Sequence, residues 1–557
     1  MRDNALEAID FQIVRTGLGI ITIYLSVFEI ILYSALVLAA LVLLVLLFIK
    51  CPKIRPKYSY ALSVMICCLL TLSLVSFAVI KPYADRDEMT ADGAGFPYFF
   101  LCSVFDRGID RPADYSEATV EKILKDLSSQ NPPQNRQTPN IVFVQLESFF
   151  DVKRIKGVEF SQDPIPNFTR LSKKHGSGLF RVKSIGSGTA NTEFEVLSGL
   201  DLEFFGIGEY PYTSILGDRC CETIAYDLAQ LGYSAHAMHN HTATFYDRYL
   251  VYANLGFDSF TALEHMKNIE YNPIGWERDE ILTEYVFKAL NSTEGRDFVF
   301  AVSVQGHGKY PDIPIGENQQ IKVSGISEER LNEMEFYVNQ LYEMDLFIGE
   351  LYDAIMSFDE DTVLVLYGDH LPALEIDENE LENENLYQTD YVVLSNFGFE
   401  LNDADINAYE LFPLVLQKLG IDNGLINQVH AAYRGSKDFG EVLRTVGYDM
   451  LYGKQIAYKG SYPFVPTDMV LGIDEILINS VQAAEDGFYV YGENFTPYSN
   501  IFADNRRLDT EFIDENTLFA PGESLEYGDG ISVAQISADF RRLSQTEPYG
   551  YTRGFLD

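Results

Sequence analysis

Residues 141–147 read IVFVQLE, an apolar run of strand length that ends on a carboxylate. Similar runs recur downstream: YSAHAM (233–238), FVFAVSV (298–304), TVLVLY (362–367) and YVVLS (391–395). Helical patterns lie between most of them, at 165–174, 193–197, 329–357 and 408–419. This alternation predicts an α/β fold with a mostly parallel sheet and helices on both faces. Near-continuous apolar strands are typical of a sheet that is buried on both sides.

The first 81 residues carry two long apolar runs, at about 17–49 and about 60–80. Because roughly 20 apolar residues span a bilayer, the second run predicts one membrane helix. The first run exceeds one span and contains Glu29, which is costly inside a membrane. It is either one helix near 30–49 with an interfacial segment before it, or two tightly connected helices. We therefore expect residues 1–81 to form a transmembrane anchor of two or three helices.

The basic residues between these runs set the orientation of the chain. They are Lys50, Lys53, Arg55 and Lys57. Because positively charged loops stay in the cytoplasm, the segment after Lys81 is expected outside the cell. The sequence thus predicts a multi-pass cell-membrane protein with an extracellular catalytic domain, rather than a cleaved signal peptide.

The rest of the chain divides by composition. Residues 82–139 read as a connector, with a helix near Ser116–Leu127 and a Pro-rich linker after it. Residues 140–459 hold the α/β catalytic domain. Residues 460–557 contain short alternating segments separated by turn residues, which predicts a small β-sandwich. Its stretch YVYGENFTPYSNIFADNRRLDTEF loosely resembles immunoglobulin-like domains of the IPT/TIG kind.

The charge of the chain excludes one class of partner. Its formal net charge is −41 and its pI is about 4.4. A polyanion would be repelled by such a surface, so we expect no nucleic-acid binding. The six cysteines show no spacing of a disulfide framework.

Polar side chains follow four of the predicted strands. They are Glu147, His239, His307, and the pair Asp369 and His370. Ligands of open α/β sheets bind at the carboxyl ends of the strands, so these side chains should meet. Each one alone is more often a turn residue or a helix cap. Only eight histidines occur in the chain and three of them fall here, which indicates a metal or acid–base site.

Thr189 lies in GSGTANTEFEV (186–196), where a Gly-rich turn leads into a helix. Taken alone, it is expected to cap that helix. A helix N-terminus also favours anions, and a hydroxyl beside a divalent metal can attack phosphorus or sulfur. The mixed oxygen and imidazole ligands suit Mn²⁺, Zn²⁺ or Mg²⁺.

Five motifs, QLESFFD, SGTANTEF, LYGDH, HNHTATFYDR and SVQGHGKYP, together resemble the lipoteichoic acid synthase family of the alkaline-phosphatase/sulfatase superfamily. The resemblance covers about residues 140–458. It implies one divalent metal, manganese first and zinc or magnesium otherwise, on Glu147, Thr189, Asp369 and His370. It implies Thr189 as the catalytic nucleophile, and His239, Tyr246, Arg248 and His307 as substrate-binding residues. His307 or His239 would protonate the leaving alkoxide, with His307 taken as the second catalytic residue.

By the same resemblance, the donor is phosphatidylglycerol in the membrane. Thr189 displaces diacylglycerol and holds glycerophosphate covalently. A hydroxyl of a glycolipid, a growing teichoic-acid polymer or a glycan then accepts it. Arg248 would grip the phosphate through its planar guanidinium.

The chain departs from the family pattern at three site positions. Gly188 stands where the family often has lysine, Tyr246 where it usually has tryptophan, and His241 where an acidic residue often helps to hold the glycerol. The membrane region is also shorter than the five helices usual in these synthases, and the C-terminal β domain is extra.

Two other functions fit parts of the sequence. A phosphoethanolamine transferase or phosphodiesterase of the same superfamily would share the metal site, although HNHTATFYDR favours glycerophosphate. A true sulfatase would need a Cys-x-Pro-x-Arg segment, which is missing from the nucleophile region. An inactive surface protein that binds through the β domain is disfavoured, because all the expected site residues are present.

Overall fold

The computed structural model describes residues 27–50, 60, 62–71, 100, 103–104, 107–130, 135–206, 208–315, 319–525, 528 and 530–550. These residues fall into two units. One holds residues 4–107 with 206–209, and the other holds nearly all of the remaining chain. Each unit is described by itself.

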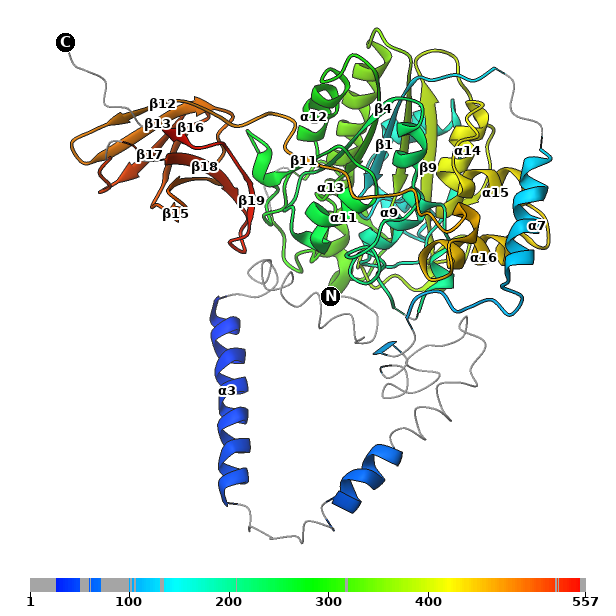
Figure 1. Ribbon diagram of the computed structural model, residues 1–557, viewed down its shortest axis with the longest axis horizontal. Coiled ribbons are helices and arrows are strands. Elements are labelled where there is room, and N and C mark those ends of the chain that lie inside the picture. The colour runs from blue at the N-terminus through cyan, green and yellow to red at the C-terminus, as the bar shows by residue number, and fades with distance from the viewer. Residues whose placement is uncertain are drawn as a thin grey trace. The chain divides into compact units, whose positions relative to one another are not determined.

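The N-terminal unit contains one long apolar helix, α3 (Val27–Lys50) (Figure 1). Its stretch Val27–Leu47 has 21 residues with a mean hydropathy of 3.1, and none of it is buried. Among the described residues it is the one helix long and apolar enough to cross a membrane, as an anchor or a signal sequence. A shorter apolar helix covers Leu62–Thr71. The basic residues at 53, 55 and 57, the segment before Val27 and the end of the second apolar run lie outside the described residues.

The second unit is built on a sheet of nine strands, and all five of the predicted apolar runs form strands in it. Their order is β10 (Ile406–Asn407), β3 (Gly176–Arg181), β9 (Gln388–Ser395), β8 (Thr362–Gly368), β1 (Asn140–Leu146), β6 (Arg296–Val302), β4 (Tyr233–His239), β5 (Ser259–Ala262) and β11 (Val470–Leu471). Only β9 runs antiparallel to its neighbours, so the mostly parallel sheet is confirmed. Because β9 is reversed, its carboxyl end lies at the opposite edge, away from the other strand ends.

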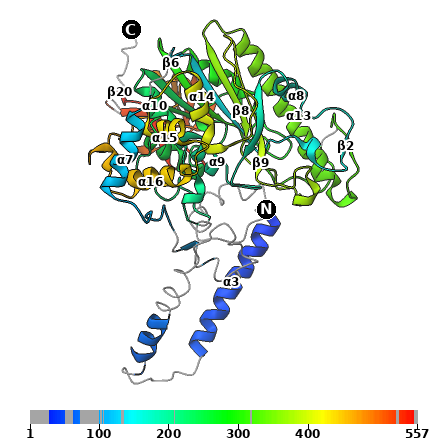
Figure 2. The same cartoon turned by 90° about the vertical axis from the view of Figure 1, so that its right-hand side faces the viewer.

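Helices cover both faces of this sheet (Figure 2). On one face, α8 (Pro166–Ser172), α12 (Ile281–Leu290) and α13 (Glu328–Met356) pack over Val142 and Val144 of β1. On the other face, the intervening Phe143 contacts Phe298, whose ring centroid is 5.7 Å away. The helices on that side include α10 (Ile224–Ala229), α14 (Leu411–Lys418), α15 (Leu425–Tyr433) and α16 (Phe439–Leu451). Alternate residues of one strand thus enter two separate cores, which explains its unbroken apolar sequence.

A helix of the predicted connector is also present, as α7 (Glu117–Ser128). Ser116 caps it, since its hydroxyl oxygen accepts a hydrogen bond from the Thr119 N–H at 3.2 Å. Residues 131–134 of the predicted linker lie outside the described part.

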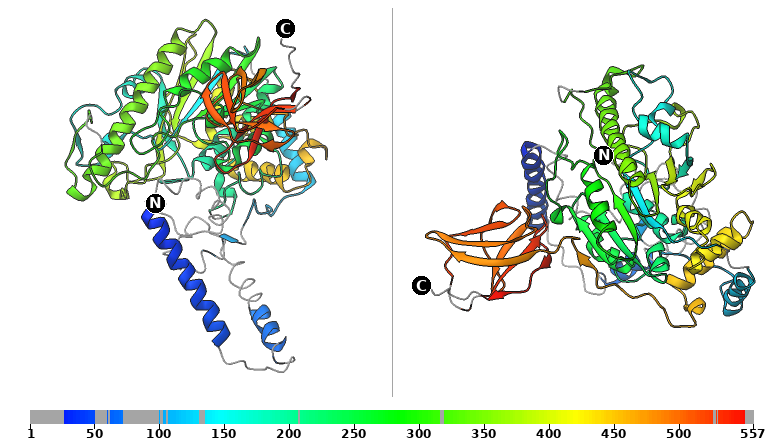
Figure 3. Two further views of the ribbon diagram at one scale, coloured as in Figure 1. Left: turned by 90° about the vertical axis from the view of Figure 1, so that its left-hand side faces the viewer. Right: turned by 90° about the horizontal axis from the view of Figure 1, so that it is seen from above.

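The C-terminal segment forms two antiparallel sheets, as expected for an all-β domain (Figure 3). One contains β12 (Leu477–Ala483), β13 (Gly487–Glu493), β17 (Thr517–Pro521) and β16 (Glu511–Asp514). The other contains β15 (Arg506–Arg507), β14 (Ser499–Ala503), β18 (Gly530–Ile536), β19 (Arg542–Gln545) and β20 (Tyr549–Gly550). Val490 and Leu518 from the first sheet share a core with Ile501 and Val533 from the second. The Arg541 guanidinium forms an ion pair with Asp247 in the HNHTATFYDR segment.

Candidate active site

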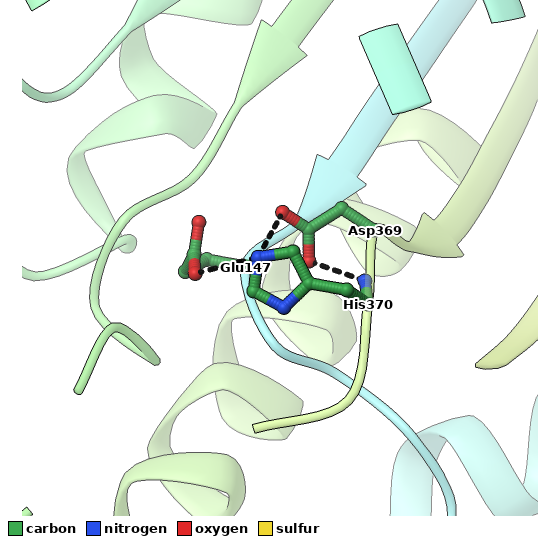
Figure 4. A group of neighbouring side chains, drawn as sticks. All are labelled: Glu147, Asp369 and His370. Atoms are coloured by element: carbon green, nitrogen blue, oxygen red, sulfur yellow. Dashed lines mark hydrogen bonds and ion pairs between the residues drawn. The ribbon is translucent and has the colours of Figure 1, made fainter. Parts of the chain in front are cut away.

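Three side chains that could hold a metal meet at the carboxyl edge of the sheet (Figure 4). The register pairs Leu146 of β1 with Gly368 of β8, so the residues that follow, Glu147 and Asp369, leave the sheet side by side. With His370 they are fully buried, and one ligand atom from each lies within 4.8 Å of the others. The parallel pairing of two strands distant in sequence therefore creates this cluster.

The hydrogen bonds of the cluster leave free ligand atoms that face one another. Asp369 Oδ1 accepts bonds from the backbone N–H of Ser148 and of His370, both at 2.7 Å. His370 Nδ1 donates to the Leu371 carbonyl at 2.9 Å, which leaves Nε2 without a proton in the neutral ring. Asp369 Oδ2 and His370 Nε2 lie 3.4 Å apart, and neither makes a hydrogen bond within the described residues.

This donor set fits a divalent cation. Burial and the nearby Glu147 carboxylate raise the pKa of Asp369 well above its ordinary value. Burial also opposes the charge of Glu147, but His370, His307 and two hydroxyl hydrogen bonds more than offset it and lower the pKa of Glu147. Two buried carboxylates this close need a compensating positive charge, and oxygen with imidazole ligands suits Mn²⁺, Zn²⁺ or Mg²⁺.

Thr189 is the first residue of α9 (Thr189–Ser198), and the cap position before it is Gly188. The cap position is therefore one residue earlier than expected, at Gly188 rather than at Thr189. The Thr189 hydroxyl instead donates a 3.0 Å hydrogen bond to Glu147 Oε2. Gln145 Nε2 donates a hydrogen bond to the Thr189 carbonyl at 3.1 Å. The hydroxyl thus lies at a helix N-terminus and against the metal-site candidate at once, which is the placement a nucleophile requires.

The structure explains why glycine, and not the lysine common in the family, stands at position 188. The φ of Gly188 is +103°, and a Cβ built there would lie 2.5 Å from Ser184 Oγ. A side chain at this position is therefore excluded both by the backbone conformation and by contact.

We expect Gly188→Ala to lower the free energy of unfolding by about 1–3 kcal/mol, because alanine is strained in this conformation. Urea denaturation measures the change. The matched control is Gly440→Ala, since that glycine has open space around its Cβ position and no positive φ. Equal unfolding midpoints for the two variants would contradict the assignment of Gly188.

A small cavity opens beside Thr189. Its wall consists of Glu147, Thr189, His239, His241, Phe245, Arg248, Trp276, Val304 and His307. The structure therefore brings the predicted residues His239, Arg248 and His307 together around the nucleophile. Tyr246 is not part of the wall, and its ring stacks on Tyr210 at 5.6 Å.

Four residues of this wall, including His241 and Trp276, had no role assigned from the sequence. His241 was noted only as a departure from the family, although it lies two residues after His239. Trp276 was missed, although it is the only tryptophan in the chain. Its ring contacts that of His307, with centroids 4.4 Å apart.

Backbone carbonyls orient the two predicted histidines. His239 Nδ1 donates to the Val302 carbonyl at 2.9 Å, and His307 Nδ1 donates to the Gly308 carbonyl at 2.6 Å. Burial, with Arg248 second, lowers the pKa of His239 well below its ordinary value, and burial lowers that of His307. In their neutral forms both rings thus keep the lone pair on Nε2.

Arg248 is tied to the nucleophile helix by a buried ion pair. Its Nε lies 3.2 Å from both carboxylate oxygens of Glu193, and its Nη2 also donates to that carboxylate. The Tyr252 hydroxyl donates to Glu193 at 2.7 Å. Burial opposes the charge of Arg248, but Glu193 more than offsets it and raises the pKa. Sequence reasoning missed Glu193, which lies one turn after Thr189 in the same helix.

Replacing Glu193 by leucine should lower the free energy of unfolding by about 3–5 kcal/mol, because it leaves the Arg248 charge buried without a partner. Chemical denaturation measures this loss. The control is the double variant Glu193→Leu with Arg248→Met, which removes both charges and is expected to recover most of the stability but none of the activity. A double variant as unstable as the single one would show that the ion pair is not the cause.

The fold and the site define a class of protein: an α/β enzyme in which a threonine hydroxyl and a metal-site candidate meet at the carboxyl edge of the sheet, as in the alkaline phosphatase superfamily. Within it, the sulfatase family matches residues 139–421, just over half of the 557 residues. The chain belongs to the sulfatase family.

Two curated relatives come from Rhizobium meliloti. A putative cyclic beta-1,2-glucan modification protein is 28% identical over 408 residues, covering 68% of this chain and 62% of that protein. The capsular polysaccharide biosynthesis protein RkpI is 26% identical over 248 residues, covering 43% of each. The chain therefore spans less than two thirds of either relative.

Solved structures share the fold of this chain, and one of them illustrates the similarity. It is the Streptococcus pyogenes phosphoglycerol transferase GacH in complex with sn-glycerol-1-phosphate. It is 23% identical, has a TM-score of 0.56, and covers 64% of this chain and all of that one.

Proposed function

We propose that this protein is a membrane-anchored phosphoglycerol transferase with an extracellular active site. It moves glycerophosphate from phosphatidylglycerol, through phospho-Thr189, to a hydroxyl of a glycan, a glycolipid or a teichoic acid. The observation that carries the proposal is the Thr189 hydroxyl, which lies at the start of α9 and donates to Glu147 beside Asp369 and His370. The names of the relatives support it, since one is a phosphoglycerol transferase and one modifies a glucan.

In the first half-reaction, a bond forms from Thr189 Oγ to the phosphorus as the bond from phosphorus to the diacylglycerol oxygen breaks. The proton of the Thr189 hydroxyl passes through His307 or His239 to that leaving oxygen. Glu147, Thr189, Asp369 and His370 would hold a divalent cation, with manganese as the first choice and zinc or magnesium as alternatives, and such a cation would favour deprotonation of the Thr189 hydroxyl. The N-terminus of α9 stabilises charge on the phosphoryl oxygens. Glu193 occupies one edge of the Arg248 guanidinium. Nη1 donates to the Phe245 carbonyl at 3.4 Å, so its second N–H is the one offered to the phosphate.

The donor is tested with the purified full-length chain in phospholipid vesicles. Vesicles of phosphatidylglycerol labelled in the head-group glycerol are compared with vesicles of phosphatidylethanolamine. We expect release of diacylglycerol and a mass increase of one glycerophosphate on the peptide that contains Thr189. An ethanolamine phosphate adduct would show instead that the protein is a phosphoethanolamine transferase. Release of glycerophosphate only into water would show that it is a phosphodiesterase. No adduct and no turnover would favour a binding protein without activity.

A further inference from the structure

His241 lies in the cavity wall with one ring nitrogen bound and the other free. Its Nδ1 lies 3.1 Å from Glu277 Oε2, and both side chains are buried. Its Nε2 is buried and has no hydrogen-bond partner among the described residues. An unsatisfied buried nitrogen is destabilising, so its position beside a cavity points to a partner that enters with the substrate.

The ring of His241 is held in place by aromatic neighbours. The rings of Trp276, Phe245 and His239 contact it edge to face, with centroids at 5.3, 5.5 and 5.9 Å. Because a carboxylate can only accept, Nδ1 carries the proton that faces Glu277, and the neutral ring keeps a lone pair on Nε2. His241 therefore offers the cavity a hydrogen-bond acceptor whose direction is fixed by Glu277.

A second buried histidine–carboxylate pair, at His236, differs from this one in its hydrogen bonds. His236 on β4 binds Ser259 through Nδ1 at 2.8 Å and Asp297 through Nε2 at 3.3 Å. Both of its nitrogens are satisfied, and it is not part of the cavity wall. Both ring nitrogens of His236 are thus used within the core, whereas Nε2 of His241 has no partner among the described residues and its side chain lines the same cavity as Thr189.

We propose that His241 is the general base of the second half-reaction and that Glu277 is its positioning residue. This inference rests on the proposed phosphoglycerol transfer. The acceptor hydroxyl donates to His241 Nε2 and attacks the phosphorus of phospho-Thr189. A bond forms between phosphorus and the acceptor oxygen, the bond from phosphorus to Thr189 Oγ breaks, and the acceptor proton passes to Nε2. His241 then releases that proton to water, and Thr189 Oγ regains one from water.

The assignment predicts a separation of the two half-reactions. His241→Gln should still cleave labelled phosphatidylglycerol once per enzyme molecule, because Thr189 and Arg248 are intact. Transfer to a β-1,2-linked glucan should then slow by about 10²-fold, the usual size of a general-base contribution. Phospho-Thr189 should accumulate in this variant. Glu277→Gln should slow the same transfer step by about 10-fold, which is less than the effect of His241→Gln.

The experiment combines rapid-quench kinetics with mass spectrometry of the Thr189 peptide. His236→Gln is the matched control, and it is expected to lose stability without accumulating the adduct. Free imidazole added to His241→Ala should restore part of the transfer rate, which a structural role would not permit. Equal loss of donor cleavage and transfer in His241→Gln, or no loss of either, would overturn the assignment. If the parent protein itself forms no adduct, the proposed function fails rather than the role of His241.

Discussion

Replacing Thr189 by alanine should reduce the release of diacylglycerol from phosphatidylglycerol by at least about 10³-fold. Removing a nucleophile disables the whole catalytic unit, so the residual rate comes only from binding and charge stabilisation. The Thr189 hydroxyl donates to Glu147, and the start of α9 has no side-chain cap hydrogen bond, so the backbone there does not depend on this hydroxyl. The variant should therefore unfold at nearly the same temperature as the parent while losing the covalent adduct.

Serine is the control for this experiment. Thr189→Ser keeps a hydroxyl at the same helix start, so it should retain measurable turnover and form the adduct on Ser. Both rates are measured with the same labelled vesicles, and thermal melts are recorded for all three proteins. Turnover by Thr189→Ala within a few-fold of the parent would eliminate the covalent mechanism.

Removing the metal should reduce activity to background and should also destabilise the fold. Without a cation, Glu147, Asp369 and His370 remain buried together, and both carboxylates then lack a full positive counter-charge. A ligand present at 100 times its dissociation constant stabilises the folded state by about 2.7 kcal/mol. Adding Mn²⁺ to chelator-treated protein should therefore raise the melting temperature and restore turnover, and Asp369→Asn should abolish both effects.

A buried aspartate that is not part of the metal-site candidate provides the control. Asp345 on α13 accepts hydrogen bonds from the backbone N–H of Asn167 and of Phe168, at 2.8 and 2.7 Å. Asp345→Asn should lower the melting temperature but keep the shift that Mn²⁺ produces. A metal-induced shift that survives in Asp369→Asn would place the cation elsewhere, and comparison of Mn²⁺, Zn²⁺ and Mg²⁺ ranks the candidates.

The sequence by itself determined the class of the fold and the candidate site residues that follow the strand ends. Five apolar runs were enough to predict the strands, since only a sheet buried on both faces needs continuous apolar strands. The site residues that follow strand ends, such as Glu147 and Asp369, could also be predicted, because the carboxyl ends of parallel strands meet at one edge. The antiparallel direction of β9 could not be predicted, because an apolar run carries no direction.

Only the tertiary structure decided which buried carboxylates bind and orient the other residues of the site. Glu193 holds Arg248 from a helix 55 residues earlier in the chain, and Glu277 holds His241 from a loop 36 residues later. A buried ion pair leaves no periodic pattern in a sequence, because either partner alone looks like an ordinary charged residue. Local patterns report which residues are buried or where an element ends, whereas the pairing of buried polar groups depends on how distant segments pack. The sequence therefore placed Thr189 at the start of a helix and predicted the residues of the metal-site candidate, and the packing of the chain decided how the groups around them are oriented.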